Sequence, residues 1–315
     1  MAENNKEANV ITIYKKNASD EKFKQIQQFQ KGSWIYVENP TKGEIKKLIK
    51  DFSLNPDQLR DAQDPYEVPR IEVEDEFAYI FTRVPYAENG KVQTKPFLII
   101  MANDFILTIS QNPFPFFENL TNGKADFATS QRTKAVLKIF FQIDSFYRTH
   151  LTDISKKVRS LGVNVERITN YDIVQFVNYE SILNDFMAAL VPTNALVKSL
   201  HSDKYLNLFE KEKELTQDLL LENEELVGLC RANLTNIVNI RQAYSSIMTN
   251  NLNRVIKLFT SLTVILTIPT MIASIYGMNI HLPLADSSHA FAIIIITILT
   301  IVILLLGIFI KNDWL

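Results

Sequence analysis

The sequence predicts an α/β domain followed by long α-helices and two C-terminal transmembrane helices. Strand-like runs occur only before residue 129, long helical patterns follow, and two uncharged apolar runs lie near the end of the 315 residues, at 258–276 and 290–310. At ~1.5 Å per residue, each run is long enough for a helix to cross the ~30 Å hydrocarbon core of a bilayer. We therefore expect a membrane protein with most of its mass on one side.

The first domain, expected at residues 1–128, mixes strand and helix signals. Thr41, with Glu44 three residues later, has the spacing of a capping box and predicts the start of a helix. Asn55-Pro56 predicts a second helix, which should end before Asp64-Pro65. Runs of β-branched and aromatic residues predict strands at 10–14, 34–37, 77–84 and 97–110. Together these elements predict a partly antiparallel sheet with helices.

Helical patterns replace the strand signals in the second domain, expected at 129–204. Two long helices are predicted, at 133–161 and 172–200. A third pattern starts near Tyr205 and meets no proline until Pro269. We expect a stalk at 205–257 that continues into the first transmembrane helix, 258–279, as one helix of about 70 residues, or ~105 Å.

Basic residues predict the orientation in the membrane. Arg254 and Lys257 precede the first span and Lys311 follows the second, whereas the loop 280–289 has no Lys or Arg. By the positive-inside rule, both termini, including the tail 311–315, should be cytoplasmic, and the loop external. The polar N-terminus has no apolar segment typical of a secretory signal, so the large domain should stay in the cytosol, beside the cell membrane. The loop's ionisable residues are His281, Asp286 and His289.

Composition argues against several classes of function. A net charge of −2 and a pI near 6.1 give no basic surface for nucleic acid. Cys230 is the only cysteine, so no disulfide can form within the chain. The four histidines are scattered, and no phosphate loop or nucleophile motif occurs, so an enzyme is the least expected class.

A polar seam follows one face of the stalk and first span. Its hydroxyl residues in the span fall within an arc of about 80° at 100° per residue; they are Thr260, Thr263, Thr267, Thr270 and Ser274. Continued toward the N-terminus at the same spacing, the seam reads Ile256, Asn253, Thr249, Ser246, Gln242, Asn239 and Thr235. Such hydroxyls can bond back to their own helix or allow close helix packing. Their alignment on one face instead favours a seam that lines water.

Two transmembrane helices cannot enclose a pathway, so transport would require several copies around an axis. Five helices ~10 Å apart leave a hole ~3.5 Å in radius, whereas four leave ~2 Å. Five copies are favoured for an ion that keeps its water, and six remain open.

The tetrapeptide Tyr276-Gly277-Met278-Asn279 ends the first of the two C-terminal spans. In that place, before a short loop, a second span and a short tail, it resembles the motif of the CorA family of magnesium transporters. The resemblance extends over almost the whole chain. It implies a funnel-shaped homopentamer in the lipid bilayer, in which the stalks and first spans line a pore for divalent cations. It also implies that residues 276–279 form the selectivity filter for Mg²⁺, which usually keeps several waters.

The resemblance assigns further residues to the pore and to regulation. Asn253 would form a second polar ring, and Ile256 with Phe259 an apolar constriction. Mg²⁺ in the cytosol would bind between chains, at Asp61 of one and Asp218 of its neighbour, and close the pore. Possible substitutes for these carboxylates are Asp64, Glu222 and Glu225.

Three features depart from the family pattern. Thr267 lies at a level that is often bulky and apolar in the family. The tail beginning at Lys311 lacks a lysine run, and the external loop carries a lone Asp286 in place of a Glu-bearing motif. These differences predict a weaker upper gate, a less basic cytoplasmic mouth and a modest external attraction for cations.

Two alternatives to Mg²⁺ transport, with Co²⁺ or Ni²⁺ as further ions, remain open. His281 and His289 near the mouth keep the zinc-transporting branch of the same superfamily in consideration, because imidazole suits zinc. A two-span sensor that conducts nothing is the second alternative. It predicts that the polar seam is sealed and dispensable.

Overall fold

The computed structural model describes residues 11–88, 90–115, 117, 120–121, 127–202, 208–280, 282–283 and 288–314. The chain divides into two compact units, with the boundary between Asn239 and Ile240 and with Val165–Arg167 grouped in the second unit. His281 and Asp286 of the predicted loop lie outside the described residues.

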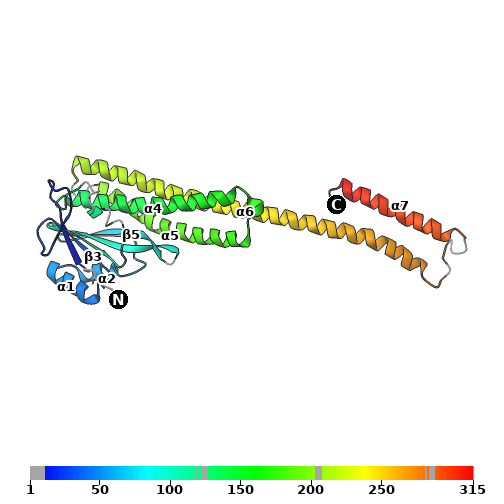
Figure 1. Cartoon of the computed structure of the whole chain (residues 1–315), viewed down its shortest axis with the longest axis horizontal. Helices are drawn as coiled ribbons and strands as arrows, with labels where there is room; N and C mark the ends of the chain where they lie inside the picture. The colour runs from blue at the N-terminus through cyan, green and yellow to red at the C-terminus, as the bar shows by residue number, and fades with distance from the viewer. Residues whose placement is uncertain are drawn as a thin grey trace, which may run out of the picture. The chain divides into compact units, whose positions relative to one another are not determined.

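A mixed seven-stranded sheet organises the first unit (Figure 1), in the order β2-β1-β3-β7-β6-β5-β4. Only β3 and β7 pair in parallel, and the other neighbours are antiparallel. The strands are β1 Ile11–Lys15, β2 Lys24–Ile26, β3 Ser33–Glu38, β4 Arg70–Glu74, β5 Phe77–Glu88, β6 Lys91–Met101 and β7 Phe105–Ser110. The expected partly antiparallel sheet is confirmed.

The strand predicted at 97–110 is wrong in its extent, because this run contains the end of β6 and all of β7. The two strands pair antiparallel, with Met101 opposite Ile106, and the Ala102 N–H donates to the Phe105 carbonyl at 3.0 Å. Because the residues on both sides of Asn103-Asp104 are apolar, the sequence pattern did not reveal the turn between the two strands. The short β2 and the charged β4 were not predicted.

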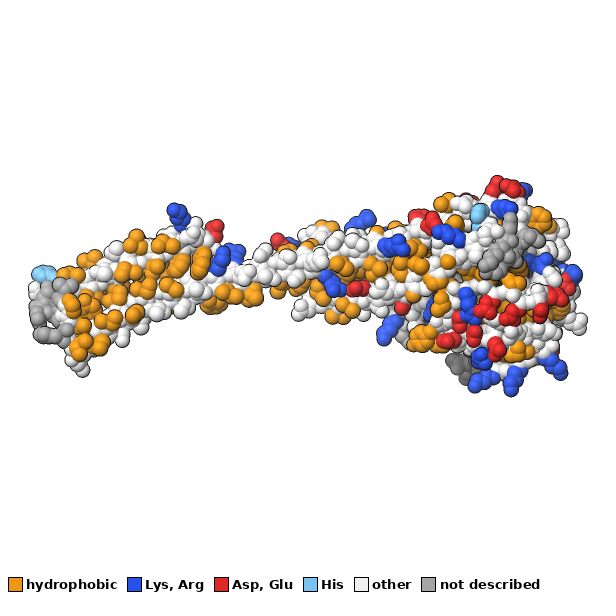
Figure 2. Space-filling view, turned by 180° about the vertical axis from the view of Figure 1, so that it is seen from behind, with side chains coloured by type: hydrophobic (Ala, Val, Ile, Leu, Met, Phe, Trp, Pro, Cys, Tyr) orange, Lys and Arg blue, Asp and Glu red, His pale blue; other side chains and the backbone are white. Residues whose placement is uncertain are grey.

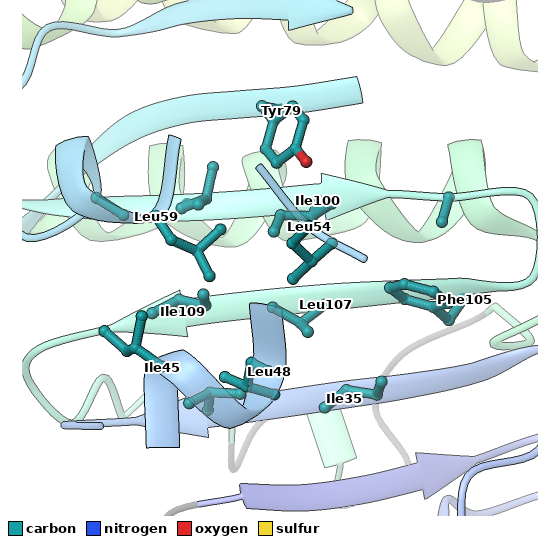
Figure 3. Packing of buried hydrophobic residues seen from close by; sticks show 14 of the residues in the cluster. Ile35, Ile45, Leu48, Leu54, Leu59, Tyr79, Ile100, Phe105, Leu107 and Ile109 are labelled. Carbon is teal, nitrogen blue, oxygen red and sulfur yellow. The ribbon is translucent and has the colours of Figure 1, made fainter. Parts of the chain in front are cut away.

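Two short helices cover one face of the sheet: α1 Lys42–Phe52 and α2 Pro56–Asp61. The predicted capping box is confirmed, since Glu44 N–H donates to Thr41 Oγ1 and Thr41 N–H donates to Glu44 Oε2. The Asn55 side chain caps α2 by accepting from the Asp57 N–H at 2.8 Å. Figure 3 shows the apolar core between these helices and the sheet; it includes Ile35, Ile45, Leu48, Leu54, Leu59, Tyr79, Ile100, Phe105, Leu107 and Ile109.

Two long helices lie on the other side of the sheet: α4 Arg132–Gly162 and α5 Asn170–His201 (Figure 1). Both were predicted to within two residues at each end. A partly buried hydrogen bond joins α4 to the sheet: the Tyr147 hydroxyl of α4 donates to the Arg83 carbonyl of β5 at 2.9 Å. The first unit is therefore a layered α/β structure.

The longest helix, α6 Glu210–Tyr276, is continuous over 67 residues. Its unbroken course is as predicted, and Pro269 lies inside it. In the first unit it contacts α5 through Lys198 and Glu224, whose Nζ and Oε1 atoms are 3.0 Å apart. The second unit contains the remainder of α6 and the next helix, α7 Ala290–Lys311.

Both helices are long and apolar enough to cross a membrane. In the second unit apolar side chains cover much of both helices, whereas Lys, Arg, Asp and Glu gather mainly over the first unit (Figure 2). This distribution separates a water-exposed unit from a lipid-compatible one.

Candidate functional site

The polar seam of α6 is exposed along its whole length in the single chain. Every seam residue from Thr235 to Ser274 is exposed, including Asn253 and Ile256. Ser261, the hydroxyl residue outside the arc, is instead fully buried. The structure therefore separates the aligned hydroxyls from the one that does not share their face.

The opposite side of α6 is the less exposed one. Ser261, Ile265, Ile268 and Ile272 share a face whose centre lies ~150° from the seam at 100° per residue. α7 runs back along α6 within the second unit (Figure 1). Its own less exposed residues include Ile294, Ile298, Ile301, Val302, Leu305, Leu306 and Phe309. The partly covered faces of the two helices are thus mainly apolar, and the seam stays uncovered.

Seam hydroxyls also bond back to their own helix. Thr263, Thr267 and Thr270 donate to the carbonyls four residues earlier at 2.7–2.8 Å. Thr297 and Thr300 of α7 do the same. Back-bonding therefore does not distinguish a pore face from any other, and only the alignment does. Because these three seam hydroxyls use their protons inside the helix, their oxygens keep lone pairs that can accept hydrogen bonds from the waters of a cation.

The tetrapeptide closes α6 with a tightened last turn. The Gly277 N–H donates to the carbonyls of Ala273 and Ser274 at 3.0 and 3.2 Å, and the Met278 N–H donates to the Ile275 carbonyl at 3.2 Å. Tyr276, Met278 and Asn279 are all exposed. The predicted helix end is present.

Gly277 does not adopt the left-handed conformation that often places glycine at a helix end. Among the described glycines only Gly32 and Gly90 have positive φ, so Gly277 does not end the helix through a left-handed conformation. A Cβ at Gly277 would meet the Ala273 and Ser274 carbonyls at ordinary distances of 3.4 and 3.5 Å. Nothing within the single chain therefore requires glycine here.

Phe259 lies at the edge of the seam and is 63 % exposed. At 100° per residue it is ~60° from the centre of the arc. In the single chain it is uncovered, as Ile256 is. A constriction of these side chains would therefore have to form between chains.

Asp61, predicted to sense metal, is the last residue of α2 and shares an arginine with two other carboxylates. Its Oδ2 is 2.9 Å from Arg70 Nη2, and Arg70 Nε is 2.6 Å from Glu72 Oε1. Glu67 is the third partner of Arg70. The hydrogen bond from Arg70 lowers the pKa of Glu72. Three carboxylates around one guanidinium group form a cluster of net negative charge where α2 meets the edge strand β4.

Asp218, its predicted partner, is exposed on α6. The substitutes Glu222 and Glu225 are both held by Arg148 of α4. Asp64 accepts a hydrogen bond from the Tyr66 N–H at 2.9 Å. Within the described part of the chain, no three His, Cys, Asp or Glu side chains form a group that could hold a metal ion.

His289 caps the start of α7 without a side-chain bond to the helix, and its Nδ1 lies 3.1 Å from Ser288 Oγ. His281 and Asp286 lie outside the described residues, so His289 is the loop histidine whose position is known.

Sequence reasoning missed a buried acidic residue, Asp144 of α4. It lies on the helix face that also carries Phe140, Tyr147 and Leu151, all buried. The 3.6-residue period of these apolar residues would have placed Asp144 in the core.

Comparisons with known proteins agree over most of the chain. The family described as CorA-like Mg2+ transporter protein matches residues 29–311. The Cobalt/magnesium transport protein CorA of Methanocaldococcus jannaschii is 26 % identical over 294 residues, which are 89 % of this chain and 90 % of that protein.

Solved structures share the fold. The complete structure of the CorA magnesium transporter from Methanocaldococcus jannaschii covers 97 % of this chain and 99 % of its own, with a TM-score of 0.85 and 19 % identity. The ZntB cytoplasmic domain from Vibrio parahaemolyticus covers 76 % of this chain and 98 % of its own, with a TM-score of 0.64 and 10 % identity. Because the family match spans more than half of the residues, the chain belongs to the family of CorA-like Mg2+ transporter proteins.

Proposed function

We propose that this chain is one subunit of a homopentameric channel that takes up Mg²⁺, and also Co²⁺, across the cell membrane. The observation that carries the proposal is the exposed polar seam of α6, which continues from the stalk to the turn at Asn279. Lipid would penalise such a stripe, whereas a wet axis shared by several copies would solvate it. Five copies leave a hole ~3.5 Å in radius if their helices are ~10 Å apart.

The direction of transport follows from the membrane potential. Moving two positive charges inward across ~100 mV is worth ~4.6 kcal/mol. With both termini in the cytoplasm, the turn 276–279 lies at the outer end of α6, where an entering ion meets it first. No chemical energy source is needed for uptake in this arrangement.

Asn279 and Gly277 form the selectivity filter in this proposal. Mg²⁺ gives up its waters reluctantly, so a ring of five Asn279 carbonyls would select it by accepting hydrogen bonds from its hydration shell. Met278 and Asn279 are exposed in the single chain and therefore free to meet neighbouring copies. Glycine at 277, which the single chain does not require, is explained if the backbone approaches a neighbour or the hydrated ion closely.

The remaining seam residues divide between lining and gating. Thr260, Thr263, Thr267, Thr270 and Ser274 line the membrane part of the pore. Asn253 forms a deeper polar ring, and Ile256 with Phe259 forms an apolar constriction that excludes ions when it is dry.

Regulation is assigned to Asp61 and Asp218. Asp218 is exposed and Asp61 is partly exposed beside Arg70, so an ion that bridges the two would join neighbouring chains. High cytosolic Mg²⁺ would then hold the chains together and close the pore, while at low Mg²⁺ the carboxylates repel and the pore opens. The two other carboxylates around Arg70 support this assignment, because they add negative charge beside Asp61.

Ion uptake into proteoliposomes tests the function. Mg²⁺, Co²⁺, Ni²⁺ and Zn²⁺ should be compared with and without a proton gradient, using empty liposomes as the background. Mg²⁺ uptake that follows the imposed potential is the expected result. Zn²⁺ uptake without Mg²⁺ uptake would instead support the zinc-transporting alternative, for which the exposed His289 and the fold shared with ZntB are the available support.

A further inference from the structure

Three side-chain contacts define how α4 and α6 lie against each other in the first unit. Arg148 of α4 contacts Glu222 and Glu225 of α6, with N···O distances of 3.4 and 3.0 Å. Further along both helices, Asn233 Nδ2 of α6 donates to Ser155 Oγ of α4 at 2.8 Å. Residue numbers rise together along this contact, so the two helices run in the same direction. One turn before Arg148 on α4 lies Asp144, whose carboxyl group interacts with the side chain of Asn223 on α6.

Asp144 and Asn223 are buried without hydrogen bonds that satisfy them. Asp144 is 1 % exposed and Asn223 is fully buried. Neither the carboxylate oxygens of Asp144 nor the side-chain polar atoms of Asn223 make a hydrogen bond of normal geometry, although the Asn223 side chain is close enough to act on the Asp144 carboxyl group. A buried carboxylate without a partner is strongly unfavourable, whereas a neutral carboxyl group beside an amide can be satisfied by turning one bond.

The geometry points to a proton-binding site at this contact: Asp144 carries a proton in the folded chain and donates it to the side-chain carbonyl of Asn223. The ligand of the site is a single proton held between α4 and the stalk. One proton gives the Asp144 carboxyl group a donor and the Asn223 carbonyl a hydrogen bond at the same time. Without this proton, any hydrogen bond between the two side chains would leave a charged carboxylate in the core.

The charged groups around the pair favour the neutral form of Asp144. Burial raises the pKa of Asp144 well above its usual value and Glu222 of α6 raises it further, whereas the Asn223 side chain and Arg148 lower it and are outweighed. Tyr147, the other titratable neighbour on α4, donates its hydroxyl proton to the Arg83 carbonyl of β5. Asp185 of α5 acts on Tyr147 and Arg83, not directly on Asp144.

Loss of the proton would redirect Arg148. An ionised Asp144 lies four residues before Arg148 on the same helix, the favourable spacing for an acid followed by a base. It would compete with Glu222 and Glu225 of α6 for the guanidinium group, and so loosen α4 from α6. The loosening of α4 from α6 does not depend on the proposed function. Only an effect of this loosening on the pore rests on it, because the proposed function makes α6 the pore-lining helix.

Infrared spectroscopy of the full-length protein in lipid nanodiscs tests whether the proton is present. The probe is the carbonyl stretch of a protonated carboxyl group at neutral pH, in wild type, Asp144→Asn and Asp153→Asn. Asp153 is an exposed aspartate of α4 and serves as the matched control. Wild type and Asp153→Asn should show the band and Asp144→Asn should lack it. A wild-type spectrum without the band, or a band that survives in Asp144→Asn, overturns the proposal.

A second variant keeps the test independent of how well Asp144→Asn folds. Asn223→Leu retains Asp144 but removes its acceptor, so the band should move to higher frequency, as for a free carboxyl group. An unmoved band would mean that Asn223 is not the acceptor and overturns the pairing.

Hydrogen exchange tests the consequence for the helix contact. Exchange of α4 and α6 amides, corrected for the intrinsic effect of pH, should speed up as Asp144 ionises, by up to tenfold per pH unit for one proton. Asp144→Asn should abolish this pH dependence, and Asp153→Asn should retain it. An equal pH dependence in all three proteins overturns the coupling. Neither measurement requires transport, so failure of the proposed function would be recognised separately.

Discussion

Tyr147 and Arg83 join the long helix α4 to strand β5 through a hydrogen bond of 2.9 Å from the tyrosine hydroxyl to the backbone carbonyl. The hydroxyl is buried, and burial raises its pKa well above the usual value, so it stays a donor at any physiological pH. The bond is therefore a fixed tie between the sheet and the helices behind it.

Replacing Tyr147 with Phe should lower the free energy of unfolding by about 1–3 kcal/mol, because the Arg83 carbonyl loses its buried donor while the ring is kept. Denaturation of the full chain, followed by tryptophan fluorescence, measures the change. Tyr171→Phe, at an exposed position of α5, is the control and should be neutral. Equal stability of both variants would show that water replaces the lost hydroxyl.

Acid should weaken the edge strand β4, whose Arg70 also binds Asp61. Hydrogen bonding to Arg70 lowers the pKa of Glu72 below its usual 4.5. A lowered folded pKa contributes stability that is present above pH ~4.5 and is lost as the pH falls through the folded value. In Arg70→Gln the loss of stability on acidification should be smaller than in wild type. Denaturation at several pH values between ~3 and ~7 measures this, and an unchanged acid limb would mean that Arg70 does not stabilise the charged Glu72.

The α/β domain was largely predictable from local signals. The capping box at Thr41 and the proline after Asn55 specify helix starts within a few residues, so α1 and α2 could be placed. The β6–β7 hairpin could not, because Phe97 to Ser110 is almost uniformly apolar and the reversal at Asn103-Asp104 lacks a glycine or proline.

The candidate site was predictable only where one helix contains it. Helical periodicity is enough to place the seam residues on one face of α6. The ion pair of Asp61 was not predicted, because Arg70 reaches this helix residue from strand β4, where it also binds Glu72. Pairing of Asp61 with Asp218 depends on a neighbouring chain, so it remains a proposal.

Thiol labelling tests whether the seam meets water. Cys230 is buried, and burial raises the pKa of its thiol to about 12, so Cys230→Ser gives a background without loss of a reactive group. In that background, Thr263→Cys and Thr267→Cys should react with a water-soluble thiol reagent in low Mg²⁺. Ile303→Cys, an apolar position of α7 exposed in the single chain, is the control and should stay unlabelled in lipid. Absence of labelling at both seam positions would support a sensor that conducts nothing.

Release of inhibition tests the metal-sensing residues. Asp61→Ala and Asp218→Ala should each keep transport active at cytosolic Mg²⁺ concentrations that close the wild type, because one side of the proposed bridge is lost. Asp51→Ala, which removes an exposed carboxylate of α1, should be inhibited normally. Full inhibition of both Asp61→Ala and Asp218→Ala would exclude the proposed regulatory site.

Removal of the Asn279 side chain tests the filter. Asn279→Ala should abolish Mg²⁺ uptake while pentamers still assemble, because the exposed side chain makes no contact that shapes the helix end, which is closed by backbone bonds at Gly277 and Met278. Uptake in proteoliposomes and the mass of the purified oligomer measure the two properties separately. Asn312→Ala, at the far end of α7, is the matched amide control and should transport normally. Normal uptake by Asn279→Ala would remove this residue from the filter, and loss of the oligomer would assign it to assembly instead.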